Sequence, residues 1–205
     1  MSLIKQNIVV MELNNIFPGL QNIHNFMFVG MFDKHEYYKN ISLFKDFSID
    51  GIESNTEWNC KLQTNFHSKG DGLLKDNIIN DLSEDILSYI QKEIKKHNFK
   101  SIEGLFYTDS KPWYNIYKKG FSQERHNHKG GRNVLSGVYY YKSPSTIRFF
   151  KWPFEKSEVV ADFEPMEGNI ILFPSIIDHS VLTYEEEAVR ISFAFNFGIK
   201  DDTIK

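Results

Sequence analysis

The first half of the chain contains one clear helical pattern. Leu82, Ile86, Ile90 and Ile94 recur every four residues, so in a helix they form one apolar stripe. Acidic residues are concentrated in the first part of this segment and lysines follow its end, as the helix dipole favours. The pattern predicts a helix whose apolar face packs against the core and has no catalytic role.

The second half of the chain changes to short apolar stretches separated by glycine and proline. Stretches of this length, rich in aromatic and β-branched residues, are typical of strands joined by turns. Such a series favours an antiparallel sandwich or barrel. The predicted strands are residues 7–12, near the start of the chain, and residues 113–117, 135–141, 146–150, 159–163, 169–173 and 190–197.

We therefore expect a mainly β protein with a helical N-terminal elaboration, built as a double-stranded β-helix (jelly roll). A chain of 205 residues can form one substantial core and is short for two. We expect a single domain over residues 1–205, in which residues 1–111 support a jelly-roll core formed by residues 112–200.

Composition narrows the functional classes. The formal net charge of -3 gives no electrostatic reason to expect binding to nucleic acid or to a membrane surface. No stretch approaches the roughly 20 apolar residues that a membrane span needs, and the first residues lack the layout of a signal peptide. The single cysteine, Cys60, excludes an internal disulfide and suits a reducing compartment. These features favour a cytoplasmic protein.

The residues that suggest chemistry lie in the strand-rich half. Two histidines form an H-x-H pair, and alternate residues of a strand leave the same face. A third histidine follows an apolar strand that ends at a Pro-Ser bend, and an R-x-S pair begins the next strand. An N-x-Y pair precedes them all. The order along the chain is Asn115 and Tyr117, His126 and His128, His179, then Arg190 and Ser192.

Residues 113–197 resemble the core of the iron(II)- and 2-oxoglutarate-dependent dioxygenases, especially the compact members of phages and marine bacteria. The phrases S-G-V-Y-Y-Y, I-L-F-P-S and R-I-S-F-A-F-N carry the resemblance. It implies an Fe(II) site and 2-oxoglutarate and O2 as cosubstrates. The implied metal ligands are His126, His128 and His179. The implied cosubstrate contacts are Arg190, as a bidentate carboxylate clamp, Ser192, and the pair Asn115 and Tyr117.

The chain departs from that family's usual pattern at His128, where most relatives have a carboxylate. A neutral imidazole there leaves the iron site with one more unit of positive charge. Glu124 is an alternative ligand, because it shares a strand face with His126 if the strand is regular. Asp178 is a poorer one, because it is adjacent to His179 and should point the other way. We expect a three-histidine site.

Two other classes of protein remain open. A cupin-type metalloenzyme shares the jelly roll and a histidine-rich metal, so the fold alone cannot separate it. Gly120, followed after five residues by H-N-H, matches the start of the cupin signature. The glutamate that this signature then requires would fall at position 132 or 133, which Arg132 and Asn133 occupy. A cupin also gives Arg190 and Ser192 no role. The third class is a non-catalytic jelly-roll binding module with incidental histidines.

The sequence does not name the primary substrate or the oligomeric state. The leading hypothesis is hydroxylation of an unidentified substrate with release of succinate and carbon dioxide. Basic residues around the H-x-H pair predict either a solvated loop or a positive mouth for 2-oxoglutarate or an anionic substrate. Gly130 and Gly131 would let this loop move as a lid, and within the aromatic run 149–154 we expect Trp152 to be exposed. The basic residues are Lys118, Lys119, Arg125, Lys129 and Arg132.

Overall fold

The computed structural model describes most of the strand-rich half and parts of the N-terminal half. The described residues are 9–12, 26–41, 43, 62–66, 76–96, 104–109, 111–150 and 159–200. Cys60 and Trp152, and the expectations that concern them, lie outside these residues.

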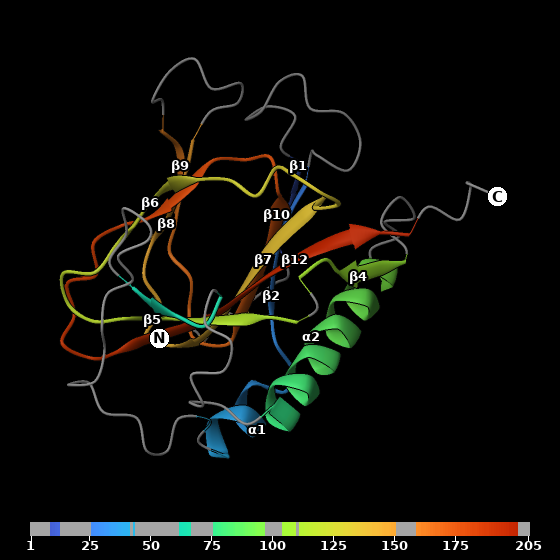
Figure 1. The fold of residues 1–205 in the computed structure, drawn as a ribbon, viewed down its shortest axis with the longest axis horizontal. Coiled ribbons are helices and arrows are strands. Elements are labelled where there is room, and N and C mark those ends of the chain that lie inside the picture. Colours follow the sequence, from blue (N-terminus) through green and yellow to red (C-terminus); the bar gives the residue numbers. More distant parts are fainter. Residues whose placement is uncertain are drawn as a thin grey trace, which may run out of the picture.

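Two antiparallel sheets form the body of the described chain (Figure 1). The larger sheet has the order β1-β2-β10-β7-β12-β5-β3, with β4 paired to β12. Its strands are β1 (Val9–Glu12), β2 (Phe26–Met31), β3 (Gln63–Thr64), β4 (Leu105–Tyr107), β5 (Trp113–Tyr117), β7 (Leu135–Lys142), β10 (Asn169–Pro174) and β12 (Arg190–Ile199). The smaller sheet has the order β6-β11-β8-β9, from β6 (Gln123–His126), β8 (Ile147–Phe150), β9 (Val159–Phe163) and β11 (His179–Val181).

The larger sheet is apolar on both faces, because helix α2 (Asp76–Lys96) packs against one face and the smaller sheet packs against the other. In β10, Ile170 and Leu172 belong to the cluster on the side of helix α2, whereas Ile171 and Phe173 belong to a second cluster with Phe149 of the smaller sheet. Alternate residues of one strand thus supply two cores. Burial on both faces explains the continuous apolar runs that replace simple alternation in the sequence.

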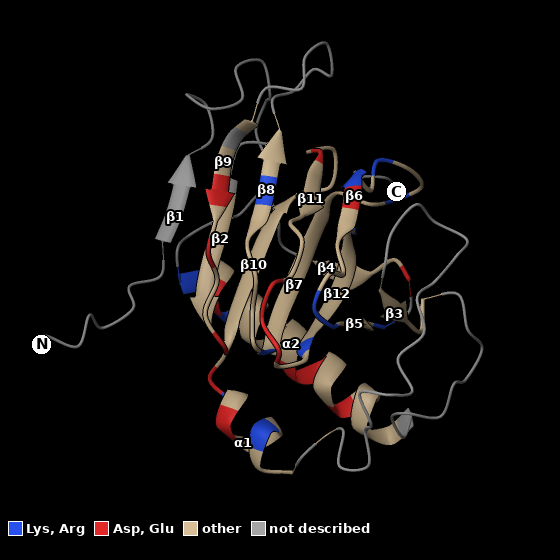
Figure 2. Cartoon of the chain, turned by 90° about the vertical axis from the view of Figure 1, so that its left-hand side faces the viewer, with Lys and Arg blue, Asp and Glu red and all other residues tan. Residues whose placement is uncertain are grey.

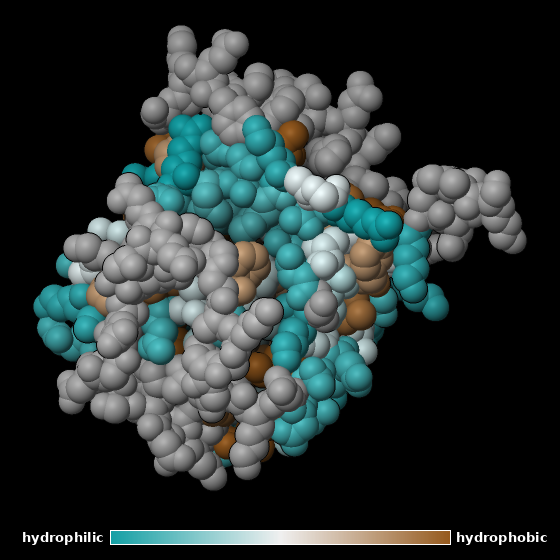
Figure 3. Space-filling view, in the orientation of Figure 1, coloured by the Kyte–Doolittle hydropathy of each residue, from teal (hydrophilic) through white to brown (hydrophobic). Residues whose placement is uncertain are grey.

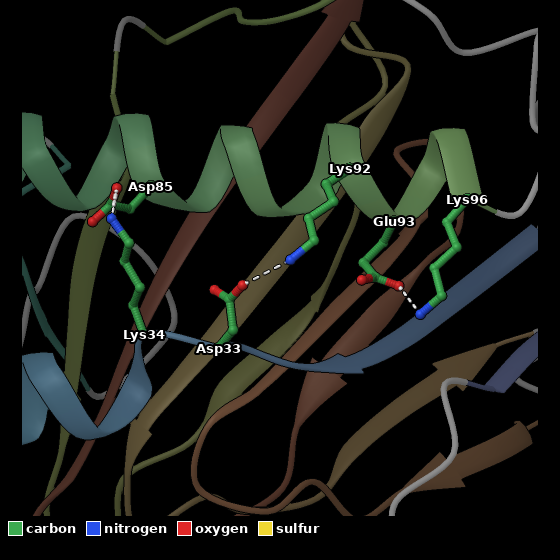
Figure 4. A network of polar contacts seen from close by, with 6 residues as sticks. All are labelled: Asp33, Lys34, Asp85, Lys92, Glu93 and Lys96. Carbon is green, nitrogen blue, oxygen red and sulfur yellow. Dashed lines mark hydrogen bonds and ion pairs between the residues drawn. The ribbon is translucent and has the colours of Figure 1, made fainter.

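Helix α2 confirms the predicted helix. Its stripe of Leu82, Ile86, Ile90 and Ile94 is fully buried in the cluster that it shares with the larger sheet. A short helix, α1 (His35–Asn40), lies beside it. On the outer side, lysines and acids link α2 to the segment before α1 (Figure 4), including the pair of Lys92 with Asp33 at 3.3 Å. Exposed pairs of this kind contribute on the order of 0–1 kcal/mol each, so burial of the stripe holds the helix in place.

The predicted strands between residues 113 and 197 all form, as does a strand within residues 7–12. The sequence pattern missed β2, β3, β4 and β11. β1 and β2 extend the larger sheet beyond β10, so part of the N-terminal half is built into the same sheet as the later strands. In the described residues no helix has the length and apolar character needed to cross a membrane. Among the described residues visible in Figure 3, apolar residues occupy separate small areas.

Candidate metal centre and cosubstrate cavity

The H-x-H pair begins in a strand and continues past its end. His126 is the last residue of β6 and lies directly opposite His179, the first residue of β11. His128 lies two residues beyond the strand, where its backbone N–H donates to the Ser175 carbonyl at 2.9 Å. The pairing of β6 with β11 therefore brings together histidines that are more than 50 residues apart in the sequence.

The three imidazoles form a compact group. One ring nitrogen from each of His126, His128 and His179 lies within 4.8 Å of the others, which is close enough for one metal ion. The ring centroids of His126 and His179 are 4.3 Å apart. Imidazole is a ligand for iron, zinc, copper and nickel, so the donor set fits Fe(II) without selecting it.

Local hydrogen bonds favour the tautomer that a metal needs. Nδ1 of His126 lies 2.8 Å from the Glu124 carbonyl, and Nδ1 of His179 lies 3.1 Å from the Ile177 carbonyl. A carbonyl only accepts, so each Nδ1 carries the proton and each Nε2 keeps its lone pair. Such hydrogen bonds orient metal-binding histidines and fix their tautomer.

The surroundings keep these histidines neutral. Burial lowers the pKa of His126, lowers that of His128 to about 3, and holds that of His179 well below its usual value. A proton on one ring would also repel a proton on its neighbours, which adds to the effect for His128 and His179. Metal ligation requires neutral imidazole, so these three histidines are in the protonation state that can bind a metal ion.

Neither alternative carboxylate belongs to the histidine group. The carboxylate of Asp178 accepts hydrogen bonds from Arg125 Nε at 2.7 Å and from Asn127 Nδ2 at 2.6 Å. Arg125 and Asn127 flank His126, so this contact ties the back of the H-x-H segment to the residue before His179. Glu124 lines an outer pocket with His126, and among the described residues the group that could hold a metal contains histidines alone.

We expect Asp178→Asn to weaken metal binding about tenfold, the lower end of what loss of an outer-shell partner costs. The substitution removes the charge that holds Arg125 and Asn127, so the two histidine-bearing segments lose their shared anchor. The measurement is a titration of metal-free protein with Co(II), followed by its visible absorption. Asp162→Asn is the matched control, because Asp162 pairs with Arg148 at 2.7 Å in an exposed position on the same sheet. Equal Co(II) affinity in both variants would contradict the positioning role.

The four predicted cosubstrate residues come from two neighbouring strands. β12 and β5 pair so that Arg190 lies opposite Tyr117 and Ser192 lies opposite Asn115. All four line one cavity, which His126, His128 and His179 also line. The structure therefore brings every predicted site residue to a single place, and the R-x-S and N-x-Y pairs are direct partners across the sheet.

Arg190 is the most unusual side chain in this cavity. It is only 2% exposed, and among the described residues its Nε and one terminal nitrogen, Nη1, have no hydrogen-bond partner. Its guanidinium stacks 4.1 Å from the centre of the Tyr117 ring and 5.8 Å from that of Tyr140. A buried cation without a counter-ion is costly, and a bound carboxylate would satisfy it through two parallel hydrogen bonds.

Two further cavity residues were not found from the sequence. The Tyr140 hydroxyl is buried and has no hydrogen-bond partner in the part of the chain that the structure describes, and Tyr140 lines the same cavity as Arg190. Gln123 accepts from the Tyr117 hydroxyl at 3.0 Å and lies 3.4 Å from His126 Nε2. Gln123 thus connects Tyr117, a candidate cosubstrate contact, to His126, a candidate metal ligand. Tyr140 belongs to the phrase S-G-V-Y-Y-Y, but three consecutive tyrosines do not reveal which one faces inward.

Two of the basic residues around the H-x-H pair form ion pairs with acids, which weakens the case for a positive mouth. Lys119 pairs with Glu187 at 2.6 Å, and Arg125 pairs with Asp178 and lies over the Phe150 ring. Figure 2 shows the resulting mixture, with basic and acidic residues side by side on β6. Among the described residues that line the outer pocket, none is lysine or arginine.

Comparison with known proteins points to one class. Residues 151–196 match the family model described as “Putative 2OG-Fe(II) oxygenase”, which confirms the resemblance seen in the sequence. The description of this family names 2-oxoglutarate and Fe(II), and the match therefore supports the cofactor pair expected from the sequence. No curated protein is significantly similar to the chain.

Solved structures give the fold. OsALKBH1 is 11% identical, with a TM-score of 0.58 over 83% of this chain and 97% of that one. A prolyl-4-hydroxylase from Pseudomonas putida is 16% identical, with a TM-score of 0.51 over 85% and 93%. HygX from Streptomyces hygroscopicus, solved with nickel and 2-oxoglutarate bound, is 10% identical, with a TM-score of 0.51 over 85% and 83%. The fold is the double-stranded β-helix expected from the sequence.

Proposed function

We propose that the protein is an Fe(II)- and 2-oxoglutarate-dependent oxygenase that hydroxylates its primary substrate. The observation that carries the proposal is the buried, partly unpaired Arg190 in the same cavity as the three histidines. A metal-only enzyme such as a cupin has no use for this cation. A dianionic cosubstrate that reaches from the metal to a buried guanidinium gives both features a role.

The residues divide into two sets of roles. His126, His128 and His179 would hold the iron through their Nε2 atoms or, for His128, through one ring nitrogen. Arg190 would bind the far carboxylate of 2-oxoglutarate, with Ser192 donating a hydrogen bond from the same strand face. Asn115 and Tyr117 would contact the cosubstrate from β5. Three ligands leave coordination positions open for the 2-oxo acid and for oxygen.

Bound Fe(II) would activate O2 so that one oxygen atom enters a substrate C–H bond and the other enters succinate, as 2-oxoglutarate loses carbon dioxide. The chain's own part is to bind, orient and exclude water. The ring centroid of His179 lies 4.8 Å from that of Phe173 and 6.3 Å from that of Phe149, so this candidate ligand has apolar neighbours. Such neighbours limit solvent access to the centre.

The three-histidine set also affects charge. Without a ligating carboxylate, the metal keeps its full double positive charge, which a dianionic cosubstrate balances. Arg190 supplies a further positive charge at the far end of the cavity. Both charges favour 2-oxoglutarate over a neutral or singly charged oxo acid.

The location and domain division remain part of this proposal. Cys60 as the single cysteine suits the reducing cytoplasm. Residues 112–200 would form the catalytic jelly roll, and residues 1–111 would support it as one domain.

The test is an anaerobic titration of metal-free protein with Fe(II) and then 2-oxoglutarate. We expect a visible charge-transfer band that needs both additions, and succinate formation once air is admitted. Succinate added in place of 2-oxoglutarate is the control, because it has the far carboxylate but lacks the 2-oxo group. Metal binding with no response to 2-oxoglutarate would point to a cupin-type site instead. Protein prepared without a polyhistidine tag that binds no metal would point to a non-catalytic module.

A further inference from the structure

A second pocket opens beside the candidate metal centre. Its volume is about 240 Å³, and among the described residues it is lined by Phe66, Trp113, Gln123, Glu124, His126, Asn127 and His128. Trp113, Gln123 and the two histidines also line the cavity that contains Arg190. The H-x-H pair therefore lies between an inner cavity, which contains Arg190, and an outer pocket. Its volume is below the roughly 300–1,000 Å³ of sites that enclose whole drug-sized ligands, so it suits one side group of a larger molecule.

One side of the outer pocket is aromatic. The rings of Phe66 and Trp113 have centroids 4.7 Å apart, and Trp113 lies 6.2 Å from the His128 ring. Phe66 is 39% exposed, whereas Trp113 is buried. A series of rings thus leads from the surface to a candidate metal ligand. A group that enters along it would meet aromatic faces before it reached the metal.

The outer pocket carries one formal charge among its described lining residues, and that charge is negative. It belongs to Glu124, whose carboxylate receives no hydrogen bond or ion pair from the described residues. Three of the five nearby bases have other partners: Lys119 contacts Glu187, Arg125 contacts Asp178, and Lys118 lies 5.2 Å from the centre of the Phe121 ring. The lining therefore favours the opposite charge from the one that the basic sequence around H-x-H suggested.

Aromatic faces together with a carboxylate form a binding surface for organic cations. The ring face attracts a positive charge through its quadrupole, with Trp the strongest, and the carboxylate supplies a counter-charge. An anionic group would instead meet Glu124 and gain nothing from the rings. A neutral aromatic group could stack on Trp113 but would leave the Glu124 carboxylate without a partner.

We propose that the outer pocket binds a cationic side group of the primary substrate, an ammonium or guanidinium, between the Trp113 and Phe66 rings and Glu124. The C–H bonds next to this group would then face the metal centre across His126 and His128. This inference rests on the proposed oxygenase function for its meaning, but the binding event itself does not need turnover.

The test compares small probes that share a shape and differ in charge. The probes are Nα-acetyl-lysine amide, Nα-acetyl-arginine amide and the neutral Nα-acetyl-norleucine amide, added to protein loaded with Fe(II) and 2-oxoglutarate without oxygen. Binding is followed by tryptophan fluorescence, and Trp113→Phe identifies the signal that arises from the pocket. We expect at least one cationic probe to bind about tenfold more tightly than the norleucine amide.

Variants of the acid complete the test. Glu124→Gln should remove most of the preference for the cationic probe, and Glu124→Lys should remove its binding. Glu164→Gln, which changes an exposed acid that does not line the pocket, should behave as the unchanged protein. If neither cationic amide bound more tightly than the norleucine amide, or if the preference survived in Glu124→Gln, the proposal would be overturned. Failure of the proposed function has a separate signature, the absence of the charge-transfer band before any probe is added.

Discussion

Acidification is expected to destabilise the metal-free protein from about pH 6.5 downward. Burial lowers the pKa of His126, His128 and His179 in the folded protein, whereas the same groups titrate near 6.5 once unfolded. Below pH 6.5 the unfolded chain therefore binds more protons than the folded one, and the free energy of unfolding falls as pH falls. By about pH 7.5 all three are almost fully neutral in both states and contribute almost no slope.

The expected effect is large because the histidines act together. Each neutral buried histidine can contribute up to about 1.4 kcal/mol per pH unit, and for His128 the effect extends toward its folded pKa of about 3. The measurement is urea unfolding of metal-free protein at several pH values between 7.5 and 5. His179→Leu should reduce the slope, because one proton no longer distinguishes the two states.

His35 also contributes to the acid dependence of stability. Burial also lowers the pKa of His35, whose Nδ1 lies 2.8 Å from the Tyr139 hydroxyl on the helix side of the larger sheet. It contributes to the acid slope but lies outside the histidine group.

Added metal should stabilise the protein at neutral pH, and protons should displace the metal in acid. The same slope in His179→Leu as in the original protein would contradict the assignment to the histidine group.

The family resemblance, more than local spacing, predicted much of this site, because it assigned roles to Asn115, Tyr117, Arg190 and Ser192. For Arg190 and Ser192, which are two apart in a predicted strand, a shared face was also expected. The direct opposition of the two pairs across β5 and β12 depends on the register of two strands far apart in the sequence. No local pattern specifies that register, which is set when both faces of the sheet are buried.

The inward orientation of Tyr140 could not be predicted for a related reason. Tyr139 and Tyr141 pack in the cluster beneath α2, while Tyr140 packs in the cluster between the sheets. Because both faces of β7 are apolar, the sequence shows no alternation that would separate them. The phase of the strand emerges only from its pairing with β10 and β12.

The sequence left open whether the bases around the H-x-H pair form a positive mouth, because their counter-charges are distant in the sequence. Asp178 lies 53 residues after Arg125, and Glu187 lies 68 residues after Lys119. Counting charges within one loop therefore measured the loop and not the surface that it forms. The same limit applies to the outer pocket, since Phe66 reaches Trp113 from a segment 47 residues earlier in the sequence.

Arg190→Met is expected to raise the dissociation constant for 2-oxoglutarate by about thirtyfold or more. Methionine keeps an apolar chain of similar length but removes the guanidinium that would bind the far carboxylate, and loss of a buried, hydrogen-bonded charge partner costs about 2–5 kcal/mol. Arg190→Lys should restore binding only in part, because an ammonium cannot form the two parallel hydrogen bonds. The measurement is the 2-oxoglutarate dependence of the charge-transfer band in Fe(II)-loaded, oxygen-free protein.

The stability of the same variant should change in the opposite direction. Without cosubstrate, Arg190 is a buried cation, two of whose nitrogens find no partner among the described residues, so replacing it with an apolar side chain should stabilise the folded protein by about 1 kcal/mol or more. Saturating 2-oxoglutarate should reverse the order, because only the original protein gains stability from the ligand. Arg148→Met, which removes an exposed arginine paired with Asp162, should change neither quantity much. If Arg190→Met instead bound 2-oxoglutarate normally and lost stability, Arg190 would serve the fold through its stacking on Tyr117 and not the cosubstrate.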